Sequence, residues 1–304
     1  MFQTQPAAYT TRFIDLPLAC LHVMEVGQGE PLIMVPATLS ELENWQALAQ
    51  FMAQWFHVYF FELPGHGQSS PFKDGFSSQR VAELVAQLAD SQGFERFNLM
   101  GFSFGGILAM RTYKLLSQRI DRLMLIAPCL DHRALAFSSF RISLLYRFNR
   151  LLKRPKVRML FCDLIHNRRT LLPIVKFLQK FGRVENGTRL EKKLLTTPAS
   201  TIEVLNVQIN EILTTEFETD PNRHKTPCYF AMSIYDPLLR FDTTLGILYN
   251  HFEDVSTMSL TYPYHQPPKA FTFEELNRDF YETVERFMQV KTGHWMGAGS
   301  DIPL

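Results

Sequence analysis

The strongest constraint on how this chain folds is the segment Gly101-Phe102-Ser103-Phe104-Gly105. It follows a short apolar run at residues 97–102, typical of a buried strand, and leads into an apolar helical pattern at residues 105–116. A strand that turns directly into a helix holds its central residue in a strained conformation, and the two glycines let helix and neighbouring strand approach closely. The segment therefore predicts a sharp strand–turn–helix with Ser103 exposed at its tip.

Strand and helix patterns alternate through the first 130 residues. Short apolar runs bounded by turn residues predict strands, and apolar positions at three- and four-residue intervals predict helices. The predicted strands are 19–26, 31–35, 57–62, 97–102 and 121–127, and the predicted helices are 45–55, 78–91 and 105–116. Such an alternation indicates a parallel sheet with helices on both faces.

The pattern changes between about residues 130 and 226. This segment has no strand pattern and is helical, basic and apolar together. The alternation then resumes, with strands predicted at 227–234 and 255–262 and a helix at 273–290. A sheet that is interrupted and then completed predicts a core of residues 1–130 and 226–304, with residues 131–225 inserted into it.

The order of these features resembles the α/β-hydrolase superfamily. The segment Glu62-Leu63-Pro64-Gly65-His66-Gly67-Gln68-Ser69 looks like the family's D-x-x-G-x-G-x-S loop, with Glu62 replacing the aspartate, and Trp45 falls where many members carry a tryptophan. The resemblance covers roughly residues 12–130 and 226–290 and not the insertion. It implies an α/β fold with a mostly parallel eight-stranded sheet, helices on both faces, a helical cap, and Ser103 as a nucleophile.

A serine nucleophile needs two partners. Its hydroxyl is weakly nucleophilic near neutral pH, so a base must take the proton and a carboxylate must orient that base. The resemblance implies the chain order nucleophile, acid, histidine. Asp236 follows the strand predicted at 227–234 and precedes Pro237, and His265 lies in the loop before the last helix. We therefore predict Ser103, Asp236 and His265 as the catalytic residues.

Alternatives remain for the acid and the base. Asp131 follows the strand at 121–127, where some relatives place the acid. His294, in Gly293-His294-Trp295, resembles the Gly-His pair frequent in the family, but it lies beyond the last predicted helix. The other seven histidines are interpreted as structural or solvated.

The predicted oxyanion hole departs from the family pattern. The N–H group of Phe104, which follows the nucleophile, is the first expected donor. Relatives often carry His-Gly in the loop that supplies the second donor, whereas this chain has Pro36-Ala37-Thr38. Because a backbone N–H needs no particular side chain, Thr38 or Ala37 is expected to supply it. Whether Thr38 instead only caps the following helix is open.

Composition and charge narrow the function. The formal net charge of +1 argues against a general nucleic-acid binder. There is no signal-peptide pattern and no run of about 18 apolar residues, so we expect a cytoplasmic protein. The four cysteines form no metal-like cluster: they are Cys20, Cys129, Cys162 and Cys228. No metal or organic cofactor is implied.

The insertion carries most of the positive charge. Residues 141–193 contain 15 Lys/Arg and 3 Asp/Glu. A helix predicted at 140–154 has an apolar stripe, flanked by arginines at three- and four-residue spacing: Phe140, Leu144, Phe148 and Leu151, then Arg147, Arg150 and Arg154. Such a helix can cover an apolar core with a charged outer face, contact an anionic membrane surface peripherally, or form a basic entrance for an acidic substrate.

Together these features predict a serine hydrolase. We expect it to cleave a carboxylic ester or a related acyl bond, including a thioester, through an acyl-enzyme. Phe102 and Phe104 flank the nucleophile and favour an apolar acyl substrate. The alternatives are a carbon–carbon bond hydrolase and a non-catalytic ligand-binding protein of the same fold, the latter supported by the altered oxyanion loop.

Overall fold

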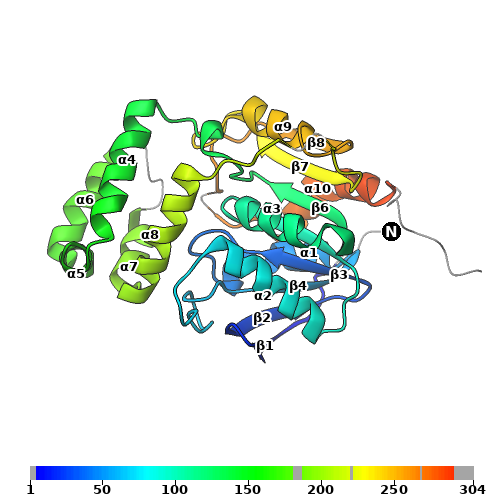
Figure 1. Cartoon of the computed structure of the whole chain (residues 1–304), viewed down its shortest axis with the longest axis horizontal. Helices are drawn as coiled ribbons and strands as arrows, with labels where there is room; N and C mark the ends of the chain where they lie inside the picture. Colours follow the sequence, from blue (N-terminus) through cyan, green and yellow to red (C-terminus); the bar gives the residue numbers. More distant parts are fainter. Residues whose placement is uncertain (1–4, 181–186, 220–221, 268, 291–304) are drawn as a thin grey trace, which may run out of the picture.

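A computed structural model describes residues 5–180, 187–219, 222–267 and 269–290 of the chain. Its centre is an eight-stranded sheet in the order β1-β2-β4-β3-β5-β6-β7-β8 (Figure 1). The pairs β1–β2 and β2–β4 are antiparallel and all the others are parallel, which confirms the predicted mostly parallel sheet. The strands are β1 (Tyr9–Asp15), β2 (Cys20–Val26), β3 (Glu30–Val35), β4 (Phe56–Phe61), β5 (Phe97–Phe102), β6 (Ile120–Ile126), β7 (Cys228–Ser233) and β8 (Val255–Leu260).

Helices cover both faces of this sheet. Side chains of α1 (Leu42–Met52) and α10 (Phe273–Met288) form one apolar layer with the sheet. Side chains of α2 (Ser78–Ser91), α3 (Gly105–Leu116) and α9 (Phe241–Tyr249) form the layer on the other face. Since successive strand residues point to opposite faces, a strand covered on both sides is apolar on both, and β3, β5 and β6 carry no polar side chain at residues 31–35, 99–102 and 123–126.

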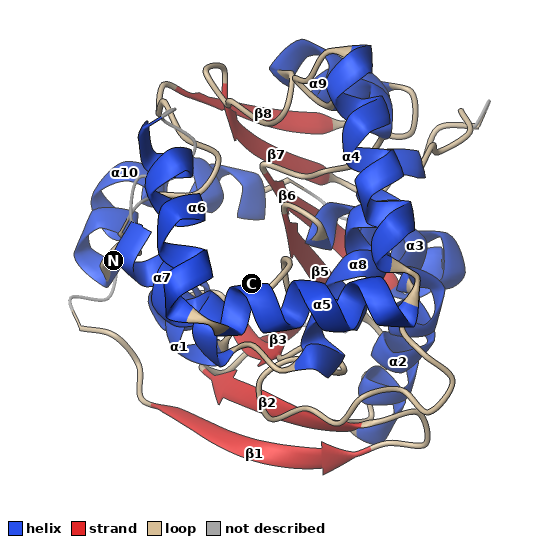
Figure 2. Ribbon diagram, turned by 90° about the vertical axis from the view of Figure 1, so that its left-hand side faces the viewer, coloured by secondary structure: helices blue, strands red, loops and turns tan. Residues whose placement is uncertain are grey.

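Among the described residues, five α-helices lie between β6 and β7: α4 (Ser139–Leu152), α5 (Pro155–His166), α6 (Arg168–Lys180), α7 (Gly187–Thr196) and α8 (Ala199–Thr214). In Figure 1 they stand to the left of the sheet, and Figure 2 shows them in front of it. They have a small core of their own, which includes Cys162, Leu171 and Ile202. Thr201 of α8 donates a hydrogen bond to the carbonyl oxygen of Gly65 at 2.9 Å, so this helical segment contacts the loop after β4.

Two elements had no counterpart in the sequence patterns. Strand β1 has almost only exposed residues, so it lacks the apolar alternation that marks a half-buried strand. Helix α9 is a short helix of 9 residues, which is too brief to show a clear helical repeat. The described part of the chain also contains two single-turn 3-10 helices, at Ser117–Arg119 and His132–Ala134.

Candidate active site

The predicted sharp turn joins β5 to α3. Ser103 sits at its tip with φ +52°, a left-handed conformation that is strained for a residue with a side chain. A Cβ atom on Gly101 would lie 2.3 Å from the carbonyl oxygen of Gly105, and one on Gly105 would lie 2.6 Å from that of Val35. The backbone carbonyl of Ser103 accepts hydrogen bonds from the N–H groups of Gly106 and Cys129, both at 2.8 Å. The turn is therefore fixed by close backbone packing.

Three predicted residues meet at the carboxyl edge of the sheet. His265 Nε2 lies 2.8 Å from Ser103 Oγ, and His265 Nδ1 lies 2.6 Å from Asp236 Oδ2. The three side chains come from the loops after β5, β7 and β8, where parallel strands end side by side. If Nδ1 donates its proton to the carboxylate, Nε2 is left to accept the serine proton.

Backbone groups hold the carboxylate of Asp236 in place. Its Oδ1 accepts hydrogen bonds from the N–H groups of Leu238 at 2.8 Å and Leu239 at 3.0 Å. Oδ2 is thereby directed to the imidazole of His265. The side chains of both residues are largely buried, and this limits competition from water.

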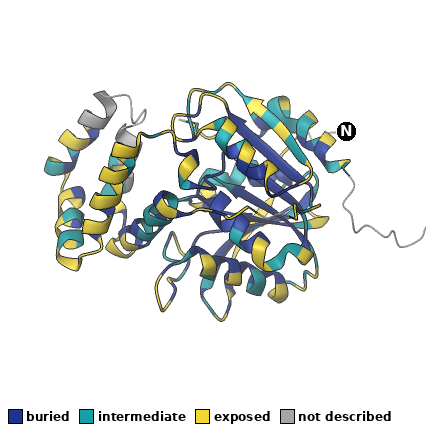
Figure 3. Cartoon of the chain, turned by 45° about the horizontal axis from the view of Figure 1, so that its top comes forward, coloured by how far each residue is buried: buried dark blue, intermediate teal, exposed yellow. Residues whose placement is uncertain are grey.

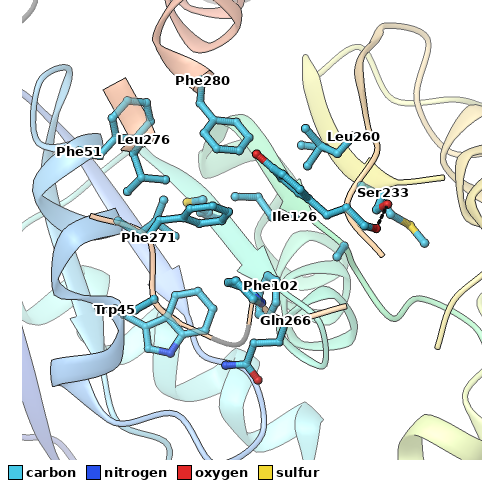
Figure 4. A pocket seen from close by; sticks show the side chains of 18 of the residues that line it. Trp45, Phe51, Phe102, Ile126, Ser233, Leu260, Gln266, Phe271, Leu276 and Phe280 are labelled. Atoms are coloured by element: carbon cyan, nitrogen blue, oxygen red, sulfur yellow. Dashed lines mark hydrogen bonds between the residues drawn. The ribbon is translucent and has the colours of Figure 1, made fainter. Parts of the chain in front are cut away.

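Ser233 is a supporting residue that the sequence patterns did not identify. Its hydroxyl donates a hydrogen bond to the carbonyl oxygen of Tyr262, drawn as a dashed line in Figure 4. The same hydroxyl accepts a hydrogen bond from the N–H of Tyr235 at 3.1 Å. It therefore links the end of β7 to the loop that carries His265. The only sequence signal for this role was a hydroxyl residue three positions before the predicted acid. Because serine is common at strand ends, that signal is not distinctive.

Aromatic rings pack behind the histidine. The ring centroids of Phe102 and His265 are 5.7 Å apart, and those of Trp45 and Phe102 are 4.9 Å apart. Such tilted contacts restrict how the imidazole can rotate. Trp45, singled out by the family resemblance, thus supports the site from α1.

Asp131, the alternative acid, has a different partner. It is fully buried, and its carboxylate accepts hydrogen bonds from Arg133 at 2.9 Å to Oδ1 and 2.7 Å to Oδ2. Burial raises the pKa of this carboxyl, but the hydrogen bonds from Arg133 outweigh that effect, so the pKa is lowered overall. The geometry favours Asp236 as the partner of His265. His294, the alternative base, lies outside the described residues.

Glu62 organises the neighbouring loop. Its Oε2 accepts a hydrogen bond from the N–H of Gln68 at 2.7 Å and lies 3.0 Å from Nδ1 of His22. A Cβ atom on Gly67 would lie within 2.3 Å of this carboxylate, and Gly67 has φ +51°. The loop therefore needs glycine at that position to close around the longer glutamate.

The two loops of the predicted oxyanion hole are adjacent. Phe104 is the N-cap of α3, and the carbonyl oxygen of Pro36 lies 3.1 Å from where a Cβ of Gly105 would be. This close approach brings the segment Pro36-Ala37-Thr38 next to the first turn of α3. The N-cap of α1 is Glu41, so capping of that helix is not the role of Thr38. The assignment of Phe104 and Thr38 as donors stays a prediction.

An apolar pocket of about 140 Å³ reaches Asp236 and His265 (Figure 4). It lies in the layer between the sheet and helices α1 and α10. In Figure 4, Phe271, Leu276 and Phe280 line one side, and Ile126 and Leu260 stand across from them. The side chains that line the pocket come from five parts of the sequence, within residues 44–52, 100–102, 124–127, 229–236 and 260–284.

Comparisons with known proteins agree with this architecture. Residues 30–173 match the family described as alpha/beta hydrolase fold. The structure also resembles that of N-formylmaleamic acid deformylase from Pseudomonas putida S16, with a TM-score of 0.64 over 92% of this chain and 100% of the other, at 16% identity. The chain therefore has the α/β-hydrolase fold. The family match and the sheet order together confirm the fold class and the resemblance found in the sequence.

Curated relatives of this chain have several activities. The chain is 27% identical over 192 residues to the dihydrolipoyllysine-residue acetyltransferase component of the acetoin cleaving system of Cupriavidus necator, covering 62% of this chain and 51% of that protein. It is 28% identical over 119 residues to the pimeloyl-[acyl-carrier protein] methyl ester esterase of Nitrosomonas europaea, covering 38% and 45%. The chain spans about half the length of the curated relatives it matches.

Proposed function

We propose that this α/β hydrolase is a serine hydrolase that cleaves a carboxylic ester, or a related acyl bond, of an apolar acyl group. The observation that carries the proposal is the continuous hydrogen-bonded path from Ser103 Oγ through His265 to Asp236. A buried carboxylate, an oriented imidazole and a hydroxyl on a strained turn make up the arrangement that activates serine for attack on a carbonyl carbon. Similarity to a methyl ester esterase supports the same class of reaction.

The proposed reaction has two halves. His265 Nε2 accepts the hydroxyl proton as Ser103 Oγ bonds to the carbonyl carbon, and the imidazolium then gives that proton to the leaving alcohol or thiol. The N–H groups of Phe104 and Thr38 would stabilise the oxyanion of the tetrahedral intermediate. A water molecule, deprotonated by His265, then attacks the acyl-enzyme and releases the carboxylic acid and the free serine.

The pocket supports an apolar acyl group. Its lining is dominated by aromatic, aliphatic and methionine side chains, including Phe51, Met100 and Phe280. Burial of apolar surface contributes about 25 cal/mol per Å², so a longer apolar chain would bind more tightly as long as the pocket accommodates it. We further propose that helices α4–α8 act as the cap over this site.

A fluorophosphonate probe tests the nucleophile. The wild-type protein should be labelled covalently at Ser103, and Ser103→Ala should not be labelled. Ser69→Ala is a matched control, because it also removes a buried hydroxyl but lies outside the proposed triad. Equal labelling of the wild type and Ser103→Ala would contradict the proposal.

A series of p-nitrophenyl esters tests the acyl group. We expect kcat/KM to rise with acyl length and then fall when the chain exceeds the pocket. Enlarging the pocket with Phe280→Ala should move the maximum to longer esters. If the probe labels Ser103 while no ester in the series is cleaved, the ester-bond assignment is wrong and the carbon–carbon hydrolase alternative gains support.

A further inference from the structure

The apolar stripe predicted on α4 faces solvent. Its members are all exposed: Phe140 (77%), Leu144 (58%), Phe148 (48%) and Leu151 (42%). We call these four residues the α4 stripe. In Figure 3, the described parts of the helices at the left, which belong to the segment between β6 and β7, are largely coloured as exposed. The α4 stripe therefore does not cover an apolar core, which was one of the three roles that the sequence allowed for it.

The inward side of α4 carries a polar residue. Asn149 and Leu152 are the buried residues of this helix. The Nδ2 atom of Asn149 donates to the carbonyl oxygen of Asn206 at 3.0 Å, and Nδ2 of Asn206 donates to that of Asn149 at 2.9 Å. These reciprocal hydrogen bonds fix the rotation of α4 against α8. Since burial of Phe140 and Leu144 would require α4 to turn and break them, the stripe is held outward by a specific contact.

Helix α5 extends the exposed apolar surface. Met159 and Leu160 are 67% and 59% exposed. The rings of Phe148 and Phe161 are in contact, with centroids 6.0 Å apart, so α4 and α5 are neighbours at this surface. Contiguous exposed apolar surface of this kind marks an interaction site in a soluble protein.

The surroundings of the stripe are strongly basic. Residues 139–176 contain ten Lys/Arg residues and one acidic residue, Asp163. Within the described part of the chain, Arg158 and Arg168 are the two of these ten that form ion pairs, with Glu203 and Glu191 respectively. Arg147 and Arg150 are exposed on α4, and Arg154 is exposed just beyond its end, as the N-cap of α5.

We propose that the α4 stripe and the adjacent surface of α5 dock on an anionic lipid bilayer. Exposed apolar side chains would enter the boundary between headgroups and acyl chains, while the flanking arginines extend to lipid phosphates. A second copy of the same face is disfavoured as the occupant, because pairing two such faces would place like charges opposite each other. Among the described residues no helix is long and apolar enough to cross a bilayer, so the contact is peripheral.

The proposal is independent of the catalytic assignment, since none of its residues belongs to the triad or the pocket. Flotation of the full chain with two kinds of vesicle tests it: pure phosphatidylcholine, and phosphatidylcholine mixed with phosphatidylglycerol. The wild type should float with the anionic vesicles and hardly at all with the neutral ones. Equal partition into both, or no binding to either, would overturn the proposal.

A triple variant of the flanking arginines tests the contribution of their positive charge to vesicle binding. Arg147→Gln/Arg150→Gln/Arg154→Gln should weaken binding to anionic vesicles on the order of 100-fold, because each basic residue near the surface contributes about 1 kcal/mol. The charge-matched control Lys73→Gln/Arg223→Gln/Lys225→Gln alters exposed residues outside helices α4–α8 and should bind nearly as the wild type does. Equal weakening by the two triple variants would mean that net charge alone drives binding, which contradicts a docking face.

The stripe is tested in the same assay. Phe140→Ser/Leu144→Ser should lower binding at least 10-fold, whereas Leu115→Ser, an exposed position on α3, should not. Thermal midpoints should be close to that of the wild type, because the changed side chains are exposed. Sedimentation without lipid would identify the rival occupant: a dimer that dissociates in Phe140→Ser/Leu144→Ser would show that a second copy covers the stripe and would overturn the proposal.

Discussion

The sheet core and helix α4 contain similar apolar repeats that the fold uses in opposite ways. In α2, Val81, Leu84, Val85 and Leu88 are fully buried against the sheet. In α4, residues at the same type of spacing face solvent, and Asn149 occupies the inward side. The difference shows that periodicity establishes an amphipathic helix, whereas the partner of its apolar side depends on what the rest of the chain packs against it.

The largest expected effect is on catalysis at the sheet edge. His265→Ala should lower kcat by about 10⁶-fold, as loss of the histidine of a serine triad does elsewhere. His166→Ala, in the helical segment, should leave kcat nearly unchanged. Steady-state kinetics on a short soluble ester measures both. Full activity in His265→Ala would contradict the assignment of His265 as the catalytic base.

The next largest expected effect is on stability, which a core substitution in β6 should lower far more than a substitution on the α4 stripe. Leu125 is fully buried in β6, so Leu125→Ala should lower the free energy of unfolding by about 2–5 kcal/mol. Leu144→Ala on the α4 stripe should change it by less than about 0.5 kcal/mol. Urea denaturation of the two variants provides the measurement. A large loss in Leu144→Ala would show that the stripe is buried in solution.

The oxyanion loop can be tested by removing a single N–H group. Thr38→Pro should lower kcat by about 10²–10³-fold with little change in KM, because proline has no backbone donor. Thr38→Ala keeps the N–H and should retain most of the activity. Similar losses in the two variants would show that the hydroxyl of Thr38, and not its N–H, matters.

The smallest expected effect concerns Asp131, whose pKa is lowered in the folded state. A carboxyl with a lowered folded pKa stabilises the fold above its unfolded pKa, and this contribution is lost as the pH falls through the folded value. Asp131→Asn should therefore cost about 1.5–3 kcal/mol near neutral pH and progressively less in acid, with kcat retained. Denaturation at several pH values checks this, and a large loss of kcat would instead favour Asp131 as the catalytic acid.

Much of the fold could be predicted from local patterns. The predicted helices at 78–91 and 105–116 and the strand at 97–102 coincide with α2, α3 and β5. Buried parallel strands and amphipathic helices leave clear apolar repeats. Strand β1 could not be found in this way, because it is held mainly by its backbone pairing with β2 and its side chains are mostly exposed.

The candidate site was predictable to a different extent at each residue. Ser103 has a local signal, since glycines that relieve the clashes at its turn lie within two positions of it. Asp236 and His265 could be chosen only through the order of elements in a resembled family. Ser233 and the N–H groups of Leu238 and Leu239 hold those side chains through contacts that leave no repeat in the sequence.

Local sequence is enough to predict the alternation of strands and helices, the strained turn at Ser103 and the amphipathic character of α4, because each depends on residues close together in the chain. The tertiary structure was needed to show that His265 lies between Ser103 and Asp236, since the strands that carry the three residues pair only after a long insertion. It also decided which way α4 faces, because the hydrogen bonds between Asn149 and Asn206 join two helices and fix their rotation.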